Sequence, residues 1–167
     1  VSVADSPSGA ANDKAVSLNA DSATGQGFLA VNDSNSPILA LAKDAFTMEA
    51  WIKLDPADAR QYEGIGAYGG SFKIGMQNQQ LEFTLYGIVD ITSGFFVPLD
   101  DAWHHVAAVW NPGVGVTLYL DGAANEIAET RLPRAFTSNI LTIGAEGVGG
   151  NALQGMIDRF RIHKVAL

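Results

Sequence analysis

Tyrosine and amide side chains gather in a few turn-rich stretches of the chain. They are Tyr62 and Tyr68 around a glycine-rich segment, Gln77 and Asn78 in a run of four amides, and Asn151 after two glycines. A sugar site combines an aromatic face, which packs on the apolar side of the ring, with amide and carboxylate groups that bond the hydroxyls. These five side chains therefore predict a carbohydrate-binding surface.

The same stretches have a second interpretation. Asn- and Gln-rich tips are ordinary turns, and a large aromatic side chain is often a core residue. Phe95, Phe96 and Gln154 share this double character. A binding surface and a set of unrelated turns are both compatible with the pattern.

Residues that could catalyse a reaction are few and poorly spaced. The chain has no cysteine, which excludes a disulfide framework, a thiolate zinc site and a cysteine nucleophile. Glu126 and Glu129 are three positions apart, and on a strand such residues point to opposite faces, so their carboxylates cannot flank one glycosidic bond. His104 and His105 are neighbours, which face opposite ways on a strand and cannot share a metal ion. The sequence favours binding over catalysis.

Charge and apolar content restrict the partners. The 167 residues carry a formal net charge of -8, and no basic stripe alternates with aromatic residues. Such a chain repels phosphate, so nucleic acid is not an expected partner. No apolar run approaches the roughly 20 residues of a membrane-spanning helix, so membrane insertion is not expected.

Because the chain starts at Val1 without a leader segment, we expect residues 1–167 to be a single domain excised from a larger multidomain protein.

Short strand-like runs separated by Gly, Asn, Asp, Pro and Ser recur along the chain, which is typical of a sandwich or a barrel. Residues 81–85 alternate, with leucine or phenylalanine at the odd positions and Glu82 and Thr84 between them, as in a strand with one buried and one wet face. Residues 106–110 are apolar throughout, as in a strand covered on both faces. The clearest runs are 14–19, 27–31, 46–54, 72–76, 81–86, 88–91, 103–110, 116–121, 126–131, 140–143 and 156–163, and residues 38–42 could form one turn of helix.

Four segments occur in a fixed order: FTMEAWIKL at 46–54, WHHVAAVW at 103–110, VTLYLDG at 116–122, and LTIG at 141–144 followed by GMIDRFRIH at 155–163. In this order and spacing they resemble the laminin-G-like branch of the concanavalin A-like lectin/glucanase superfamily, over roughly residues 14–167. The resemblance implies an all-β fold, namely a two-sheet antiparallel jelly-roll β-sandwich.

The resemblance also implies a structural calcium ion. Domains of this type often hold one calcium between an early loop and the last strand, and Asp158 stands at the matching acidic position. Asn32 and Asp33 could supply further oxygen ligands, since calcium takes six to eight of them. The alternative is that these three residues form turns and are solvated.

Two further features bear on catalysis and on sugar stacking. The retaining glucanases of the superfamily carry Glu-x-Asp-x-x-Glu on one strand, and this string is absent here. We expect the three tryptophans to be largely buried core residues and not surfaces on which a sugar ring stacks, because each lies in a framework segment. They are Trp51, Trp103 and Trp110.

The sequence therefore predicts a non-catalytic carbohydrate-binding or adhesion module of a secreted or cell-surface protein, with a glycan or polysaccharide as partner. The alternatives are a protein-interaction or structural spacer domain and, from another class, a glycan-active hydrolase or lyase, because this fold hosts all of these functions.

Overall fold

The computed structural model describes residues 2–3, 5–10, 13–18, 27–32, 44–58, 60–135, 137–148 and 150–167. These residues form thirteen strands and no helix. Within the same ranges no segment forms a helix able to span a membrane. The predicted turn of helix at 38–42 lies outside the described residues.

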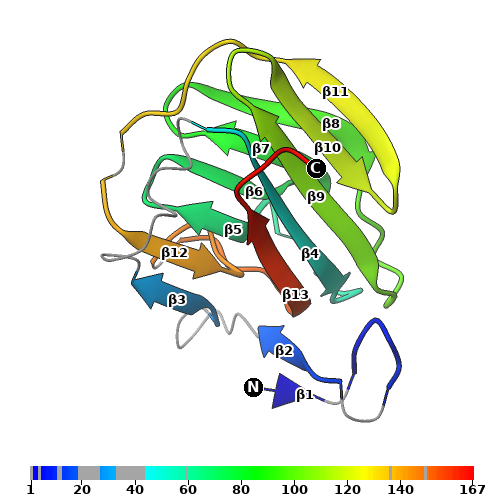
Figure 1. The fold of residues 1–167 in the computed structure, drawn as a ribbon. Coiled ribbons are helices and arrows are strands. Elements are labelled where there is room, and N and C mark those ends of the chain that lie inside the picture. Colours follow the sequence, from blue (N-terminus) through cyan, green and yellow to red (C-terminus); the bar gives the residue numbers. More distant parts are fainter. Residues whose placement is uncertain are drawn as a thin grey trace.

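The strands form two antiparallel sheets that stack on each other (Figure 1). The seven-stranded sheet runs β1 (Ser2–Val3), β2 (Ala15–Leu18), β13 (Gly155–His163), β4 (Phe46–Leu54), β9 (His104–Asn111), β10 (Gly115–Leu120) and β11 (Ala123–Ala128). The six-stranded sheet runs β3 (Leu29–Asn32), β12 (Ile140–Ile143), β5 (Tyr62–Tyr68), β6 (Phe72–Gln77), β7 (Gln80–Leu85) and β8 (Val89–Phe96). The predicted jelly-roll sandwich is confirmed.

The core lies between the two sheets and is built on aromatic rings. Phe46 of β4 stacks on Phe72 of β6 with ring centroids 4.6 Å apart, and Phe83 of β7 stacks on Trp110 of β9 at 5.6 Å. All four side chains are buried. Alternate residues of β6 and β7 fill this layer, which leaves the residues between them on the outer face of the six-stranded sheet.

The burial of the tryptophans was predicted correctly for only one of the three. Trp110 is fully buried, whereas Trp51 and Trp103 are half-buried. Trp51 stands opposite His105 on the outer face of the seven-stranded sheet, and the indole nitrogen of Trp103 donates a hydrogen bond to Asp5. A framework position on a strand can face outward as well as inward, because successive side chains alternate between faces.

Two segments that looked like loops are strands. Residues 62–68 form β5, an inner strand of the six-stranded sheet, and Phe95 and Phe96 end β8. Glycines hid β5 from the sequence pattern, since glycine weakens a strand and adds no apolar side chain. Gly64 is required there, because a Cβ on it would lie 2.1 Å from the backbone of Ala145, where the connection between β12 and β13 crosses the sheet.

Candidate functional site

Four side chains form a row across the outer face of the six-stranded sheet. Tyr62 pairs with Gln77, Gln77 with Gln80, and Gln80 with Phe96, so the row crosses β5, β6, β7 and β8. Directly paired residues point to the same face, and strands lie about 4.8 Å apart, so the row is about 14 Å long between its outer Cα atoms. Tyr62 is 39% exposed and Phe96 is 62% exposed. Two accessible aromatic rings therefore flank two amides. We call these four residues the aromatic–amide row.

Local backbone geometry fixes the centre of this row. Asn78 and Gln79 have φ angles of 49° and 64°, which gives the two-residue turn with two left-handed residues that suits the twist of a hairpin. The turn places Gln77 opposite Gln80, and the Nε2 of Gln77 donates a hydrogen bond to the Tyr62 hydroxyl at 3.1 Å.

A hollow of about 360 Å³ opens beside the row. It is lined by Tyr62, Lys73, Glu82, Thr84, Tyr86, Gly87, Asp90, Glu146 and Asn151. The sheet supplies its floor, and the connection between β12 and β13 supplies Glu146 and Asn151. The carbonyl of Asn151 accepts hydrogen bonds from the N–H groups of Gly64 and Glu146, which holds this connection against β5.

An ion pair lies under the hollow. The Nζ of Lys73 lies 2.9 Å from Oε1 of Glu82 and also contacts Oε1 of Glu146. The side chains of Lys73 and Glu82 are only 5% and 2% exposed. Burial disfavours the charged form of Lys73, but its hydrogen bonds to Glu146 and Glu82 outweigh burial and raise the pKa.

Two further hydrogen bonds organise the hollow. The amide of Asn151 donates to Oε2 of Glu146 at 2.6 Å, and the hydroxyl of Tyr86 donates to the Glu146 carbonyl at 2.6 Å. Burial, followed by the charges of Glu146, Glu82 and Asp90, raises the pKa of the Tyr86 hydroxyl above its ordinary value. The hydroxyl thus stays a hydrogen-bond donor.

The structure brings together three of the five side chains expected to bind a ligand. Tyr62 and Asn151 line the hollow, and Gln77 is bonded to Tyr62. Asn78 is exposed at the hairpin tip beside the row, where its conformation forms the turn. Tyr68 is different, because it is 0% exposed and stacks on Phe72 in the core. The prediction that Tyr68 contacts a surface ligand is therefore wrong, since β5 turns this side chain inward.

The sequence did not identify the charged residues of the hollow as a group. The alternation in residues 81–85 did place Glu82 and Thr84 on the wet face of a strand, and the same alternation in β6 places Lys73 there. Glu146 lies in a connection far along the chain, and no local pattern links it to that face.

Glu82 and Glu146 form a convergent acidic pair, which bears on hydrolysis. A glycoside hydrolase needs one carboxyl group to carry a proton as general acid, opposite a second carboxylate. Here both carboxylates bond the same ammonium group. In this structure the pair therefore holds the ammonium group of Lys73 between its two carboxylates.

The neighbouring histidines face opposite ways, as predicted. Both ring nitrogens of His104 contact carboxylates, those of Asp121 and Asp100, while His105 contacts Glu49. In the part of the chain that the structure describes, no three His, Cys, Asp or Glu residues are grouped so that they could hold a metal ion.

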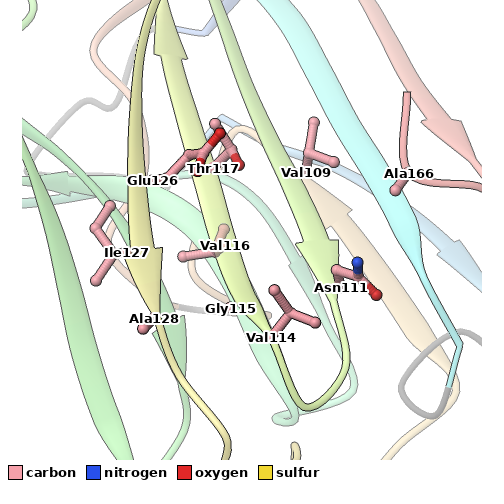
Figure 2. A pocket seen from close by; sticks show the side chains of 10 residues that line it. All are labelled: Val109, Asn111, Val114, Gly115, Val116, Thr117, Glu126, Ile127, Ala128 and Ala166. Carbon is pink, nitrogen blue, oxygen red and sulfur yellow. The ribbon is translucent and has the colours of Figure 1, made fainter.

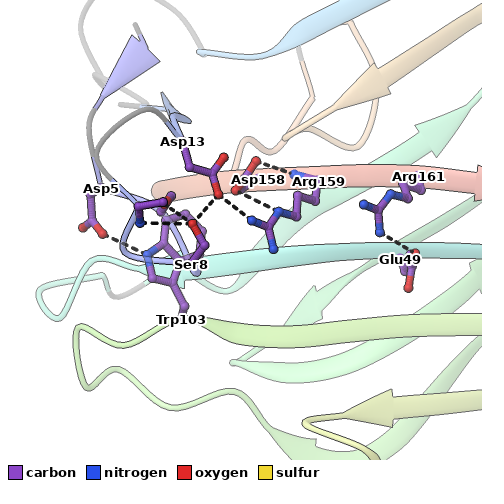
Figure 3. Close-up of polar contacts among 10 residues, drawn as sticks. Asp5, Ser8, Asp13, Glu49, Trp103, Asp158, Arg159 and Arg161 are labelled. Atoms are coloured by element: carbon purple, nitrogen blue, oxygen red, sulfur yellow. Dashed lines mark hydrogen bonds and ion pairs between the residues drawn. The ribbon is translucent and has the colours of Figure 1, made fainter.

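The predicted calcium ligands are only partly described. Oδ1 of Asp158 accepts the N–H of Arg159, while Oδ2 is buried without a hydrogen bond and lies 3.7 Å from Nε of Arg159 (Figure 3). Asn32 ends the exposed strand β3 of the other sheet, and Asp33 lies outside the described residues. Calcium binding stays a prediction.

A separate groove of about 390 Å³ lies along β9, β10 and β11 of the seven-stranded sheet (Figure 2). Its lining is mainly aliphatic, with Val109, Val114 and Ile127, and none of the described residues that line it is aromatic. None of the side chains predicted to bind a ligand lies there, so the aromatic–amide row and its hollow are the stronger candidate site.

A buried carboxyl group near the site makes stability depend on pH. Burial, followed by a hydrogen bond to Asp58, raises the pKa of Glu63 from its usual 4.5 to about 8. The folded protein holds this proton more tightly than the unfolded chain, so the stability it contributes is complete below pH 4.5 and is lost as the pH rises through about 8. We expect the free energy of unfolding to fall between these values by up to about 1.4 kcal/mol per pH unit.

Urea unfolding at several pH values measures this slope. Glu63→Gln keeps an oxygen that accepts the N–H of Gln154 and adds an amide that donates to Asp58, so it should flatten the slope and stabilise the protein at pH 9. An unchanged slope in the variant would show that another group titrates.

Solved structures that are similar in fold include three binding domains. One described as the receptor binding domain matches with a TM-score of 0.69 and 17% identity, over 90% of this chain and 38% of that chain. The binding domain of botulinum neurotoxin DC in complex with rat synaptotagmin II matches with a TM-score of 0.67 and 15% identity, over 90% and 39%. The same type of domain in complex with SialylT matches with a TM-score of 0.64 and 16% identity, over 85% and 37%. At these identities the likeness is one of fold, and the chain spans less than half the length of these structures.

No curated protein matches the chain. A sequence family does match, over residues 12–167, which include strands of both sheets and the residues of the candidate site. The match agrees with the order of the framework segments and with the observed sandwich. The chain belongs to the concanavalin A-like lectin/glucanases superfamily.

Proposed function

We propose that this domain is a non-catalytic glycan-binding module, and that the glycan lies along the aromatic–amide row with one sugar beside the hollow. The observation that carries the proposal is the pairing of two exposed rings, Tyr62 and Phe96, with the amides of Gln77 and Gln80 on one open sheet face. The rings pack on apolar sugar faces, and the amides bond hydroxyl groups.

The structural neighbours support binding in general. One is a binding domain in complex with SialylT and another is a binding domain in complex with synaptotagmin II. A glycan or a protein is therefore the kind of partner to test. The open sheet face leaves little surplus binding energy after ordering costs, so we expect dissociation constants in the micromolar to millimolar range.

The net charge of the domain limits which glycans we expect it to bind. With a net charge of -8, the domain repels sulfated or uronate-rich chains unless a cation bridges them. Partners without dense negative charge are the ones to expect. We place the domain in a longer, multidomain protein that is secreted or exposed at the cell surface, because this is where a module that adheres to glycans acts.

A glycan array followed by titration with the best hit tests the proposal. Tyr62→Ala and Phe96→Ala should each weaken binding by about tenfold, the effect of losing one aromatic contact of about 1–1.5 kcal/mol. Tyr119→Ala is the matched control, since Tyr119 is half-buried on the outer face of the seven-stranded sheet.

Three other outcomes would count against the proposal. Loss of binding in the Tyr119 variant alone would move the site to the other sheet. An array without any hit would favour the protein-interaction or spacer function. Release of reducing ends from a bound glycan would favour a hydrolase.

We also propose that calcium, when bound, stabilises the fold through Asp158. What supports this is the buried Oδ2 oxygen of Asp158, which accepts no hydrogen bond among the described residues. A ligand that binds only the folded state adds about 2.7 kcal/mol at a 100-fold excess over its Kd, so calcium should raise the Tm and a chelator should lower it. Asp158→Asn should abolish the response, while Asp44→Asn, a change at an exposed residue, should retain it. A Tm that ignores both calcium and chelator would contradict the site.

A further inference from the structure

The glycan site carries an uneven charge. Glu82, Asp90 and Glu146 bring three carboxylates to the lining of the hollow, and Lys73 brings one ammonium group. Two negative charges are therefore left over. Arg134 donates a hydrogen bond to the carbonyl of Gly87 at the rim, and counting it still leaves one negative charge.

Most of the polar atoms of the hollow already have partners. Glu146 uses both carboxylate oxygens, one on Lys73 and one on Asn151, and Asp90 accepts a hydrogen bond from Thr84 at 2.7 Å. Glu82 is the exception. Its Oε1 bonds Lys73, but its Oε2 is buried and has no partner among the described residues. A buried carboxylate oxygen without a donor is costly, so Glu82 is a group that a ligand can satisfy.

We propose that the hollow binds the ammonium group of an unacetylated amino sugar within the glycan that lies along the aromatic–amide row. This inference rests on the proposed glycan-binding function and specifies its ligand. The ammonium group brings three donors and a positive charge, and it bonds Glu82 and the exposed carboxylate of Asp90. The terminal torsion of a glutamate is broad, so a rotation of the Glu82 carboxylate turns an oxygen toward the ligand while Lys73 keeps the other.

Two alternative ligands fit the hollow less well. A metal ion would share its ligands with the ammonium group of Lys73, and no metal-binding cluster exists among the described residues. A sialylated or sulfated sugar would place a negative charge against the surplus carboxylates of the hollow. An amino group matches both the charge and the missing donor.

The experiment compares three tetrasaccharides of equal length by calorimetry: a chitin oligomer, its fully deacetylated form, and a cellulose oligomer. We expect the wild-type protein to bind the deacetylated form about tenfold more tightly than the other two, and to lose much of this preference when the salt concentration is raised from about 0.02 to 0.5 M. Glu82→Gln should reduce the preference for the deacetylated form to about twofold or less.

Two further variants keep the test decisive. Asp90→Asn changes an exposed side chain of the same hollow, so it should reduce the preference even if Glu82→Gln unfolds the protein. Glu126→Gln removes a carboxylate from the other sheet and should retain the preference. Equal binding of all three oligomers would overturn this inference and leave glycan binding intact, whereas binding of none of them would count against both.

Discussion

Replacing Lys73 with methionine is expected to lower the free energy of unfolding by about 3–5 kcal/mol. The substitution removes the ammonium group that bonds both Glu82 and Glu146, and the side chain of Glu82 is only 2% exposed. A buried carboxylate without a counter-charge is among the most destabilising changes that a single substitution makes. Urea unfolding at neutral pH measures the loss.

The double variant Lys73→Met, Glu82→Leu is the control. It removes the buried carboxylate of Glu82 together with the ammonium group of Lys73. Replacing a whole buried ion pair by apolar residues often changes stability little. We expect it to recover most of the stability that the single variant loses. If the two variants are equally unstable, the pair matters for its packing and not for its charge.

Replacing Tyr68 with alanine is expected to destabilise the protein by about 3–5 kcal/mol, because it opens a large cavity in a well-packed core. Tyr68 has no exposed surface and its ring stacks on Phe72, with the centroids 5.9 Å apart. Tyr62→Ala, six positions earlier on the same strand, should change stability by no more than about 0.5 kcal/mol. Thermal or urea unfolding of the two variants measures the difference. Equal loss in both would mean that Tyr62 is also part of the core.

These two tyrosines show where the sequence was informative and where it was not. The sequence predicted that both side chains contact a ligand, but the direction in which each points depends on β5, which the glycines concealed. The pairing of Gly64 with Gly75 is followed by a register shift before Gly66, and this bulge reverses which side chains face the core. A strict alternation counted from Tyr62 would have placed Tyr68 outside.

The strands themselves were predicted where apolar and polar residues alternate. Residues 46–54 and 140–143 match β4 and β12 at both ends. The first run stops at Asp55 and Pro56, and the second lies between Asn139 and Gly144. The hollow could not be predicted in the same way. It needs Glu146, whose connection reaches β5 through backbone hydrogen bonds from Gly64 and Glu146 to Asn151, and such contacts leave no periodic trace in the sequence.

The place of β13 has a consequence for how the protein is made. The ribosome translates β13 after all the other strands, yet β13 lies between β2 and β4 and pairs with both. Until the ribosome has released that segment, β2 and β4 each expose an unpaired backbone edge, which invites pairing with other chains. The seven-stranded sheet therefore closes only after translation of the domain is complete, and a nascent chain stalled before Gly155 is the species most prone to aggregate.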